Sequence, residues 1–135
     1  MFVSETRIRV RYSETDQMGV VYYGHYAQYF EVGRAEAIRE LGWTYRQLEE
    51  SGILMPVVSM QLRYHRPARY DDLLLVRTQV SEPPGRLITF SSQIFNEEGI
   101  HLTSGEVTLT FIDQATGRPC PAPEKLINTF EPFFS

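Results

Sequence analysis

The sequence predicts an α+β fold in which an antiparallel sheet packs against one long helix. Residues 24–41 carry apolar side chains at helical spacing, whereas five other stretches alternate polar and apolar residues as strands do. The connections between the later strands are short, which favours antiparallel pairing. The predicted order is therefore one strand, a long helix, a short helix and four further strands.

The first strand is expected over residues 7–12, where arginines alternate with Ile8, Val10 and Tyr12. This alternation places the three apolar side chains on one face and the arginines on the other. A short loop containing Asp16 then leads to the long helix.

The long helix is expected from Gly24 to about Leu41, and Gly42 is a suitable residue to end it. A glycine in mid-helix costs about 1 kcal/mol relative to alanine, so Gly33 indicates a close approach of the helix to the sheet. The expected apolar stripe comprises Tyr26, Phe30, Gly33, Ala37 and Leu41. Off this stripe, Glu31 and Glu36 would be solvated or paired with Arg34 and Arg39.

A short helix is expected over residues 45–51, because Thr44 and Gln47 have capping-box spacing. Strands are expected over 56–66, 72–81, 86–96 and 101–112, with turn residues between them. The short links predict that these strands are antiparallel neighbours in chain order. Residues 124–130 are expected to form a terminal helix. With no repeat or linker, residues 1–135 are expected to form a single domain.

Composition excludes several classes of function. The chain has 42% hydrophobic residues and a net charge of -4, so it is expected to fold and lacks the basic excess typical of nucleic-acid partners. Cys120 is the only cysteine and the three histidines are scattered, so no metal site is expected. No apolar run approaches the ~20 residues that cross a membrane, and no signal peptide is evident. A cytoplasmic location is expected.

Asp16 has two interpretations. An Asp in a short, glycine-containing loop commonly caps a turn. Alternatively, this carboxylate lies just before a helix start, whose unpaired N–H groups can stabilise a developing oxyanion. A base and an oxyanion site together suit attack on a carbonyl group.

Two further sets of residues are ambiguous in the same way. His25 can exchange a proton near neutral pH, or it can simply meet solvent at the helix start. Arg63, Arg66 and Arg69 form the most basic stretch. They either line an exposed strand end or bind phosphate groups.

The pairs Arg11-Tyr12 and Thr15-Asp16, together with Tyr26 and residues 19–23, resemble the active-site signature of the 4-hydroxybenzoyl-CoA thioesterase type of hotdog-fold proteins. The resemblance is greatest to small bacterial acyl-CoA thioesterases and extends through residues 29–34 and 64–72. It implies a hotdog fold, in which a curved antiparallel sheet of about five strands wraps around one long helix. It also implies a homodimer or homotetramer with sites at the dimer interface.

The resemblance assigns roles to residues of the motif. Asp16 would be the catalytic carboxylate, acting as general base or as nucleophile, and the backbone N–H of Tyr23 would polarise the thioester carbonyl. Gly24 and Tyr26 would bind substrate. His25 stands where the family often has a small amide residue, so its part in catalysis stays open. The CoA phosphates would meet Arg66 and Arg69.

The predicted function is hydrolysis of an acyl-CoA thioester without metal or cofactor, CoA being part of the substrate. An acyl carrier protein is a second partner that the resemblance allows. Two alternatives remain open at this point. One is a non-catalytic acyl-CoA-binding or assembly protein, and the other is a hotdog hydratase or dehydratase that pairs His25 with Glu31 or Glu36.

Overall fold

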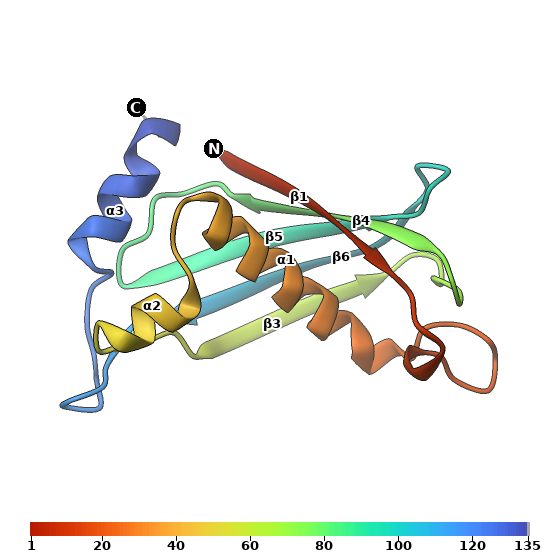
Figure 1. Ribbon diagram of the computed structural model, residues 1–135, viewed down its shortest axis with the longest axis horizontal. Helices are drawn as coiled ribbons and strands as arrows, with labels where there is room; N and C mark the ends of the chain where they lie inside the picture. Colours follow the sequence, from red (N-terminus) through yellow and green to blue (C-terminus); the bar gives the residue numbers. More distant parts are fainter. Residues whose placement is uncertain (135) are drawn as a thin grey trace.

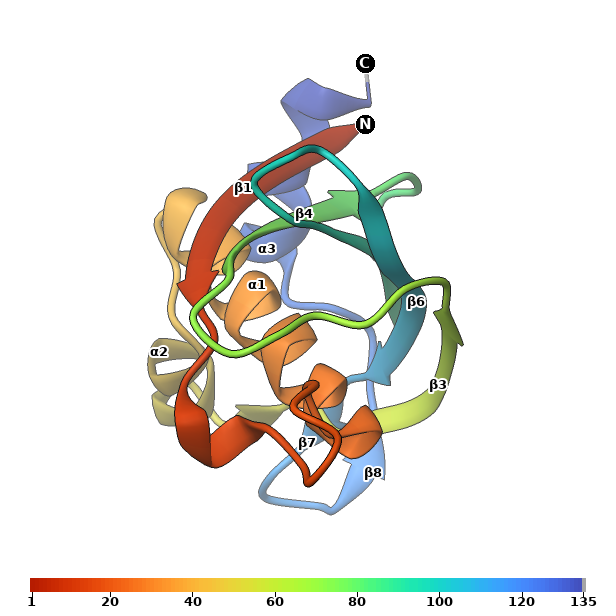
Figure 2. The ribbon, with the colours of Figure 1, turned by 90° about the vertical axis from the view of Figure 1, so that its right-hand side faces the viewer.

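The computed structural model describes residues 1–134, in which a five-stranded antiparallel sheet curves around one long helix (Figures 1 and 2). The strand order is β1-β4-β5-β6-β3. The strands are β1 (Phe2–Arg9), β3 (Val57–Tyr64), β4 (Leu73–Val80), β5 (Leu87–Phe95) and β6 (His101–Thr110). The long helix α1 (Tyr26–Glu40) lies against the inner face of this sheet.

Smaller elements close the end of the sheet remote from the start of α1. They are helix α2 (Tyr45–Glu50), the short strands β2 (Ile53–Leu54), β7 (Ile112–Asp113) and β8 (Arg118–Pro119), and helix α3 (Glu124–Phe130). The three short strands form a second sheet, which the sequence did not predict because two residues show no periodicity. The N-terminus lies beside the end of the described chain, where the Met1 ammonium donates to Phe133 O (Figure 1). None of the helices within residues 1–134 is long and apolar enough to cross a membrane.

Helix α1 has the predicted position and the predicted contact with the sheet. Its end is marked by Gly42, which adopts φ +93°. A Cβ atom on Gly33 would lie 2.6 Å from Thr78 Oγ1 and 2.9 Å from Val76 Cγ1 on β4. The glycine therefore allows the close approach that its mid-helix position indicated.

The helix divides the core into two apolar clusters. One surrounds Phe90, Phe111 and Phe130 near α3, and the other surrounds Tyr29 and Phe30 near the start of α1. Each fully buried side chain of this size contributes about 1.5–3 kcal/mol. The second cluster includes Val10 and Val21, which flank the loop that contains Asp16.

The prediction that the last four strands are neighbours in chain order is wrong for β3. This strand pairs with β6, with Tyr64 opposite Thr103, whereas β4 pairs with β1 and β5. The link over residues 65–72 crosses the sheet instead of forming a hairpin. It can do so because it spans up to roughly 25 Å when extended. It is held on the way by a bond from Val21 N–H to Ala68 O of 2.8 Å. As a result, β3 forms an edge of the sheet.

The prediction for Tyr12 is also wrong. Strand β1 runs from Phe2 to Arg9, and the Tyr12 side chain is 78% exposed instead of sharing a face with Ile8 and Val10. The reason is local, because the Glu14 carboxylate accepts a hydrogen bond from Arg11 N–H and residues 12–14 form a 3-10 turn.

Candidate active site

The loop that contains Asp16 is a tight turn between β1 and α1. Asp16 N–H donates to Val20 O at 2.9 Å, and Gly19, at φ +77°, donates back to Asp16 O at 3.0 Å. The carboxylate Oδ1 accepts from Met18 N–H at 2.8 Å, as the turn interpretation predicts. Oδ2 makes no hydrogen bond to any part of residues 1–134. One carboxylate oxygen therefore shapes the loop and the other is free.

The start of α1 presents backbone donors. A 3-10 turn, Tyr23–His25, leads into the helix, and within residues 1–134 neither Tyr23 nor Gly24 donates its N–H to an acceptor. The turn is fixed from two sides, by Tyr22 N–H to Glu14 O and by Tyr64 Oη to Tyr23 O, both at 3.0 Å. Free N–H groups at the positive end of a helix dipole form an anion-binding position.

A hollow of about 230 Å³ lies beside this helix start. Its walls include Tyr23, Tyr26, Tyr64 and Arg66. The Tyr26 hydroxyl accepts from Ala68 N–H at 3.1 Å. Burial, and to a smaller extent the charge of Asp16, raise the pKa of Tyr26, so this hydroxyl stays neutral. Asp16 does not line the hollow, but its charge is near enough to raise the pKa of Tyr26.

Glu14 is a buried carboxylate that the sequence reasoning missed. It is 5% exposed and accepts from Arg11 N–H at 2.8 Å and from Tyr29 Oη at 2.9 Å. Arg11 Nη2 and His25 Nε2 each lie 3.2 Å from Oε2. Burial opposes ionisation, but the hydrogen bonds from Arg11, Tyr29 and His25 lower the pKa of Glu14 below its usual value. Burial and the bond to Glu14 raise the pKa of Tyr29.

His25 is held by this cluster and does not merely meet solvent. Its side chain is 19% exposed, and its ring packs edge-on against Tyr29 with centroids 5.3 Å apart. Its acidic partner is Glu14 and not Glu31 or Glu36, since Glu36 pairs with Arg39 and Glu31 is exposed. The acid–base pair considered for a hydratase is therefore not formed.

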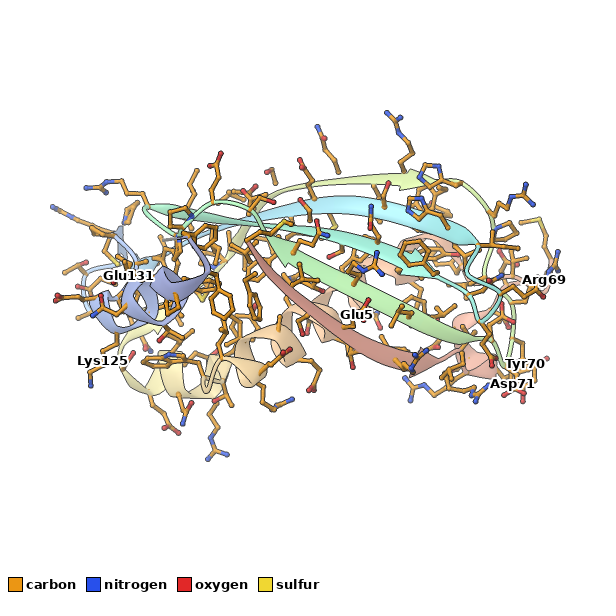
Figure 3. The ribbon with its side chains drawn as sticks, turned by 90° about the horizontal axis from the view of Figure 1, so that it is seen from above. Glu5, Arg69, Tyr70, Asp71, Lys125 and Glu131 are labelled. Carbon is orange, nitrogen blue, oxygen red and sulfur yellow. The ribbon has the colours of Figure 1, made fainter. Side chains whose placement is uncertain are left out.

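The two candidate phosphate-binding arginines differ in position. Arg66 lines the hollow, whereas Arg69 lies outside it, with its N–H bonded to Asp72 Oδ2 at 2.9 Å. Both side chains are exposed. Figure 3 shows Arg69 at one end of the molecule, opposite the end that carries Lys125 and Glu131. Residues 1–134 contain no group of three or more side chains of the metal-binding types placed to hold an ion.

The model of the thioesterase-like superfamily matches residues 10–130. This chain belongs to that superfamily. The match begins just after β1 and includes the whole site described above. This chain is 36% identical over 122 residues to the putative acyl-CoA thioesterase YneP of Bacillus subtilis, and the match covers 88% of this chain and 86% of the relative.

A second relative is the acyl-CoA thioester hydrolase YbgC of Escherichia coli, which is 30% identical over 124 residues and covered to 92% in both chains. Among solved structures, DHNA-CoA thioesterase from Staphylococcus aureus superimposes with a TM-score of 0.93 at 33% identity, over 98% of this thioesterase and 91% of that chain. The predicted hotdog fold is confirmed, and so is the class of enzyme, a thioester hydrolase.

The structure gathers most of the predicted site at the start of α1. Tyr23, Gly24 and His25 form the turn itself, and Tyr26 is the first residue of the helix. Asp16 lies in the adjoining loop. The roles assigned to these thioesterase residues stay predictions. The one local signal for Glu14 is its position three residues after Arg11, where a carboxylate can bond back to the capping residue's N–H.

Proposed function

We propose that this thioesterase hydrolyses acyl-CoA to a free acid and CoA. The observation that carries the proposal is the arrangement at the start of α1, where the N–H groups of Tyr23 and Gly24 have no acceptor within residues 1–134 and Asp16 keeps one oxygen free in the adjoining loop. The names of the relatives, acyl-CoA thioesterase and acyl-CoA thioester hydrolase, support the choice of substrate.

The thioester carbonyl oxygen would accept from Tyr23 N–H. Negative charge develops on that oxygen as the carbonyl carbon is attacked, so a donor fixed before the reaction lowers the barrier. Removal of one such donor typically reduces the rate by about 10²–10³. The bond from Tyr64 Oη to Tyr23 O fixes the position of this turn.

Asp16 would supply the attacking group in one of two ways. As general base it takes a proton from water, the water oxygen attacks the carbonyl carbon, and the C–S bond breaks to release CoA thiolate, which is then protonated. As nucleophile its free oxygen attacks directly, CoA thiolate leaves, and water hydrolyses the resulting anhydride to regenerate Asp16 and release the acid.

Arg66, which lines the hollow, and Arg69, which lies outside it, would bind the phosphates of CoA, because guanidinium groups pair well with phosphate oxygens. The reaction needs no metal or cofactor. An acyl carrier protein that presents the same phosphopantetheine thioester would be an alternative donor of the acyl group.

The oligomer proposed for this enzyme is a homodimer joined through β3, or a homotetramer of two such dimers. An eight-residue edge strand offers unpaired backbone groups to a second copy. Val57 and Val58 on this strand are exposed. We propose a cytoplasmic location, with which the free thiol of Cys120 is consistent.

A second candidate function is acyl-CoA binding without turnover. The hydrogen bond from Met18 N–H to Asp16 Oδ1 favours it, since this contact gives Asp16 a structural reason to be present. The two candidates differ in what Asp16→Asn does. A hydrolase loses turnover and keeps binding, whereas a binding protein changes little in either.

The test is CoA release from short, medium, long-chain and aromatic acyl-CoAs, measured for wild type and Asp16→Asn together. Rapid release by wild type that is lost in the variant supports hydrolysis and identifies the acyl class. Binding of acyl-CoA with no release from any member contradicts it. Acyl carrier protein thioesters are assayed in the same panel.

A further inference from the structure

A second hollow, of about 310 Å³, lies between α1, α2 and the beginning of β3. It is separate from the hollow at the start of α1. Leu48, Met55 and Val57 supply apolar walls, and Arg34 and Tyr45 supply polar ones.

Arg34 is buried, and two of its nitrogen atoms have no hydrogen-bond partner in the part of the chain that the structure describes. The residue is 5% exposed, and its Nε and Nη1 atoms make no hydrogen bond within residues 1–134. The Tyr45 hydroxyl oxygen is likewise buried and makes no hydrogen bond in that part of the chain, although it lies near enough to Arg34 for this cation to lower the pKa of Tyr45 in part. Glu31 and Glu49 lie at the rim, but both are exposed and neither is within ion-pair distance of Arg34. A buried cation without a counter-group is costly, so an oxygen from elsewhere is expected to complete this site.

The chemistry of the hollow selects an acceptor. A guanidinium has only donors. Burial raises the pKa of Tyr45 by more than the neighbouring Arg34 lowers it, so the Tyr45 hydroxyl stays protonated and can also donate. A ligand that suits both groups has an apolar body and an acceptor oxygen at its end.

The two hollows lie at opposite ends of β3. Val57, the first residue of the strand, lines the Arg34 hollow, and Tyr64, the last, lines the hollow beside Tyr23. In Figure 1, α2 lies near the beginning of β3 and the loop before α1 lies beyond its end. Two copies of β3 paired antiparallel about a two-fold axis reverse one strand against the other. Full overlap then places Val57 opposite Tyr64 of the partner subunit.

We infer that the Arg34 hollow of one subunit completes the acyl site of its partner, and that Arg34 and Tyr45 bind an acceptor oxygen, a carboxylate or a hydroxyl, at the far end of the acyl group. The inference rests on the proposed thioester hydrolysis. The carbonyl is held at the start of α1 in one subunit, and the acyl group extends across the β3 edge into the other. Selectivity for oxygen-bearing acyl groups is then a property of two subunits together.

The first test compares matched substrates. The ratios of kcat/KM are measured for 4-hydroxybenzoyl-CoA over 4-methylbenzoyl-CoA and for adipoyl-CoA over hexanoyl-CoA, which separate the hydroxyl from the carboxylate. Wild type is expected to favour the oxygen-bearing member of at least one pair by about tenfold or more. Arg34→Met removes that preference, and Arg39→Met, an exposed change five residues further along α1, keeps it.

Tyr45→Phe serves as a second variant, since it removes only the hydroxyl oxygen and disturbs the fold less than Arg34→Met does. Hydrolysis without preference in either pair, or a preference that survives both Arg34→Met and Tyr45→Phe, overturns the inference while the proposed hydrolysis stands. If Arg34→Met lowers the stability of the protein but leaves its substrate selectivity unchanged, Arg34 has a structural role only, and this result also overturns the inference. Failure of wild type to hydrolyse any thioester defeats the proposed function itself.

The second test places Arg34 in the neighbouring subunit. Differently tagged Asp16→Asn and Arg34→Met chains are co-expressed, and the mixed dimer is isolated through both tags. If Arg34 serves the partner's site, one of the two sites combines an intact Asp16 with an intact Arg34 and shows wild-type selectivity. If both residues act within one chain, the mixed dimer shows only the altered selectivity of Arg34→Met. That result, or a monomeric enzyme at assay concentration, overturns the shared site.

Discussion

Replacement of Glu14 by Gln tests the buried cluster that holds the start of α1. The change keeps the volume of the side chain but removes its charge and turns one oxygen into a donor. That donor would face Arg11 and His25, which approach Oε2 at 3.2 Å as donors themselves. Hydrogen bonds to a charged group contribute about 1.5–3 kcal/mol each, although they are not additive. We therefore expect Glu14→Gln to lower the free energy of unfolding at pH 7 by about 2–4 kcal/mol.

The effect has a defined dependence on pH. Because hydrogen bonding lowers the pKa of Glu14 in the folded state from its ordinary 4.5, the ionised form stabilises the fold. This stabilisation is fully present above the unfolded value and is lost as the pH falls through the lower, folded value. The difference between wild type and Glu14→Gln should thus be largest at neutral pH and shrink below about pH 4.5.

The assay is urea unfolding at several pH values and one fixed protein concentration, so that any oligomerisation contributes equally. Glu36→Gln is the matched control, because its partner Arg39 is exposed and such surface pairs contribute about 0–1 kcal/mol. The account also expects kcat/KM to fall about tenfold in Glu14→Gln, since His25 and the adjoining turn lose their support. A loss of stability no larger than that of Glu36→Gln, or one that does not change with pH, would refute this reasoning.

Two further predictions concern packing and substrate binding. Gly33→Ala should destabilise the fold by about 1–3 kcal/mol, because crowding against Thr78 Oγ1 outweighs the gain in helix propensity of about 1 kcal/mol. Thermal unfolding measures this effect, and Thr78→Ala in the same chain should recover part of the loss; a Gly33→Ala protein as stable as wild type contradicts the packing. Arg66→Ala should raise KM for acyl-CoA about tenfold and weaken its salt dependence. Arg69→Ala, outside the hollow, should change KM less, and equal effects would mean that the hollow does not orient the CoA.

Local patterns account for the elements that the sequence predicted well. The apolar period of α1, the capping box of Thr44 and Gln47, and the alternation of β4 each act within a few residues. Gly33 was informative for the same reason, because a mid-helix glycine has a cost that only a close contact can offset.

The features that escaped prediction depend on contacts between distant segments. The pairing of β3 with β6 instead of β4 is decided by the whole sheet and not by the length of one link. Glu14 was not singled out, because its partner Tyr29 lies fifteen residues away, on α1. Arg34 was expected near the glutamates of its helix, and its burial follows from the positions of α2 and β3.

The central claim is that Asp16 performs chemistry and does not only shape its loop. Asp113 offers a matched control, because its Oδ1 accepts from Ala115 N–H at 2.9 Å in a turn of the same kind as that of Asp16 and Met18. Asparagine keeps the acceptor oxygen at either position, so both turns survive the substitution. The decisive measurement is CoA release in a single turnover by Asp16→Asn and Asp113→Asn, with acyl-CoA binding measured in parallel. The account predicts that Asp16→Asn binds acyl-CoA but releases CoA at least about 10²-fold more slowly, while Asp113→Asn matches wild type. Release at the wild-type rate by Asp16→Asn would contradict it.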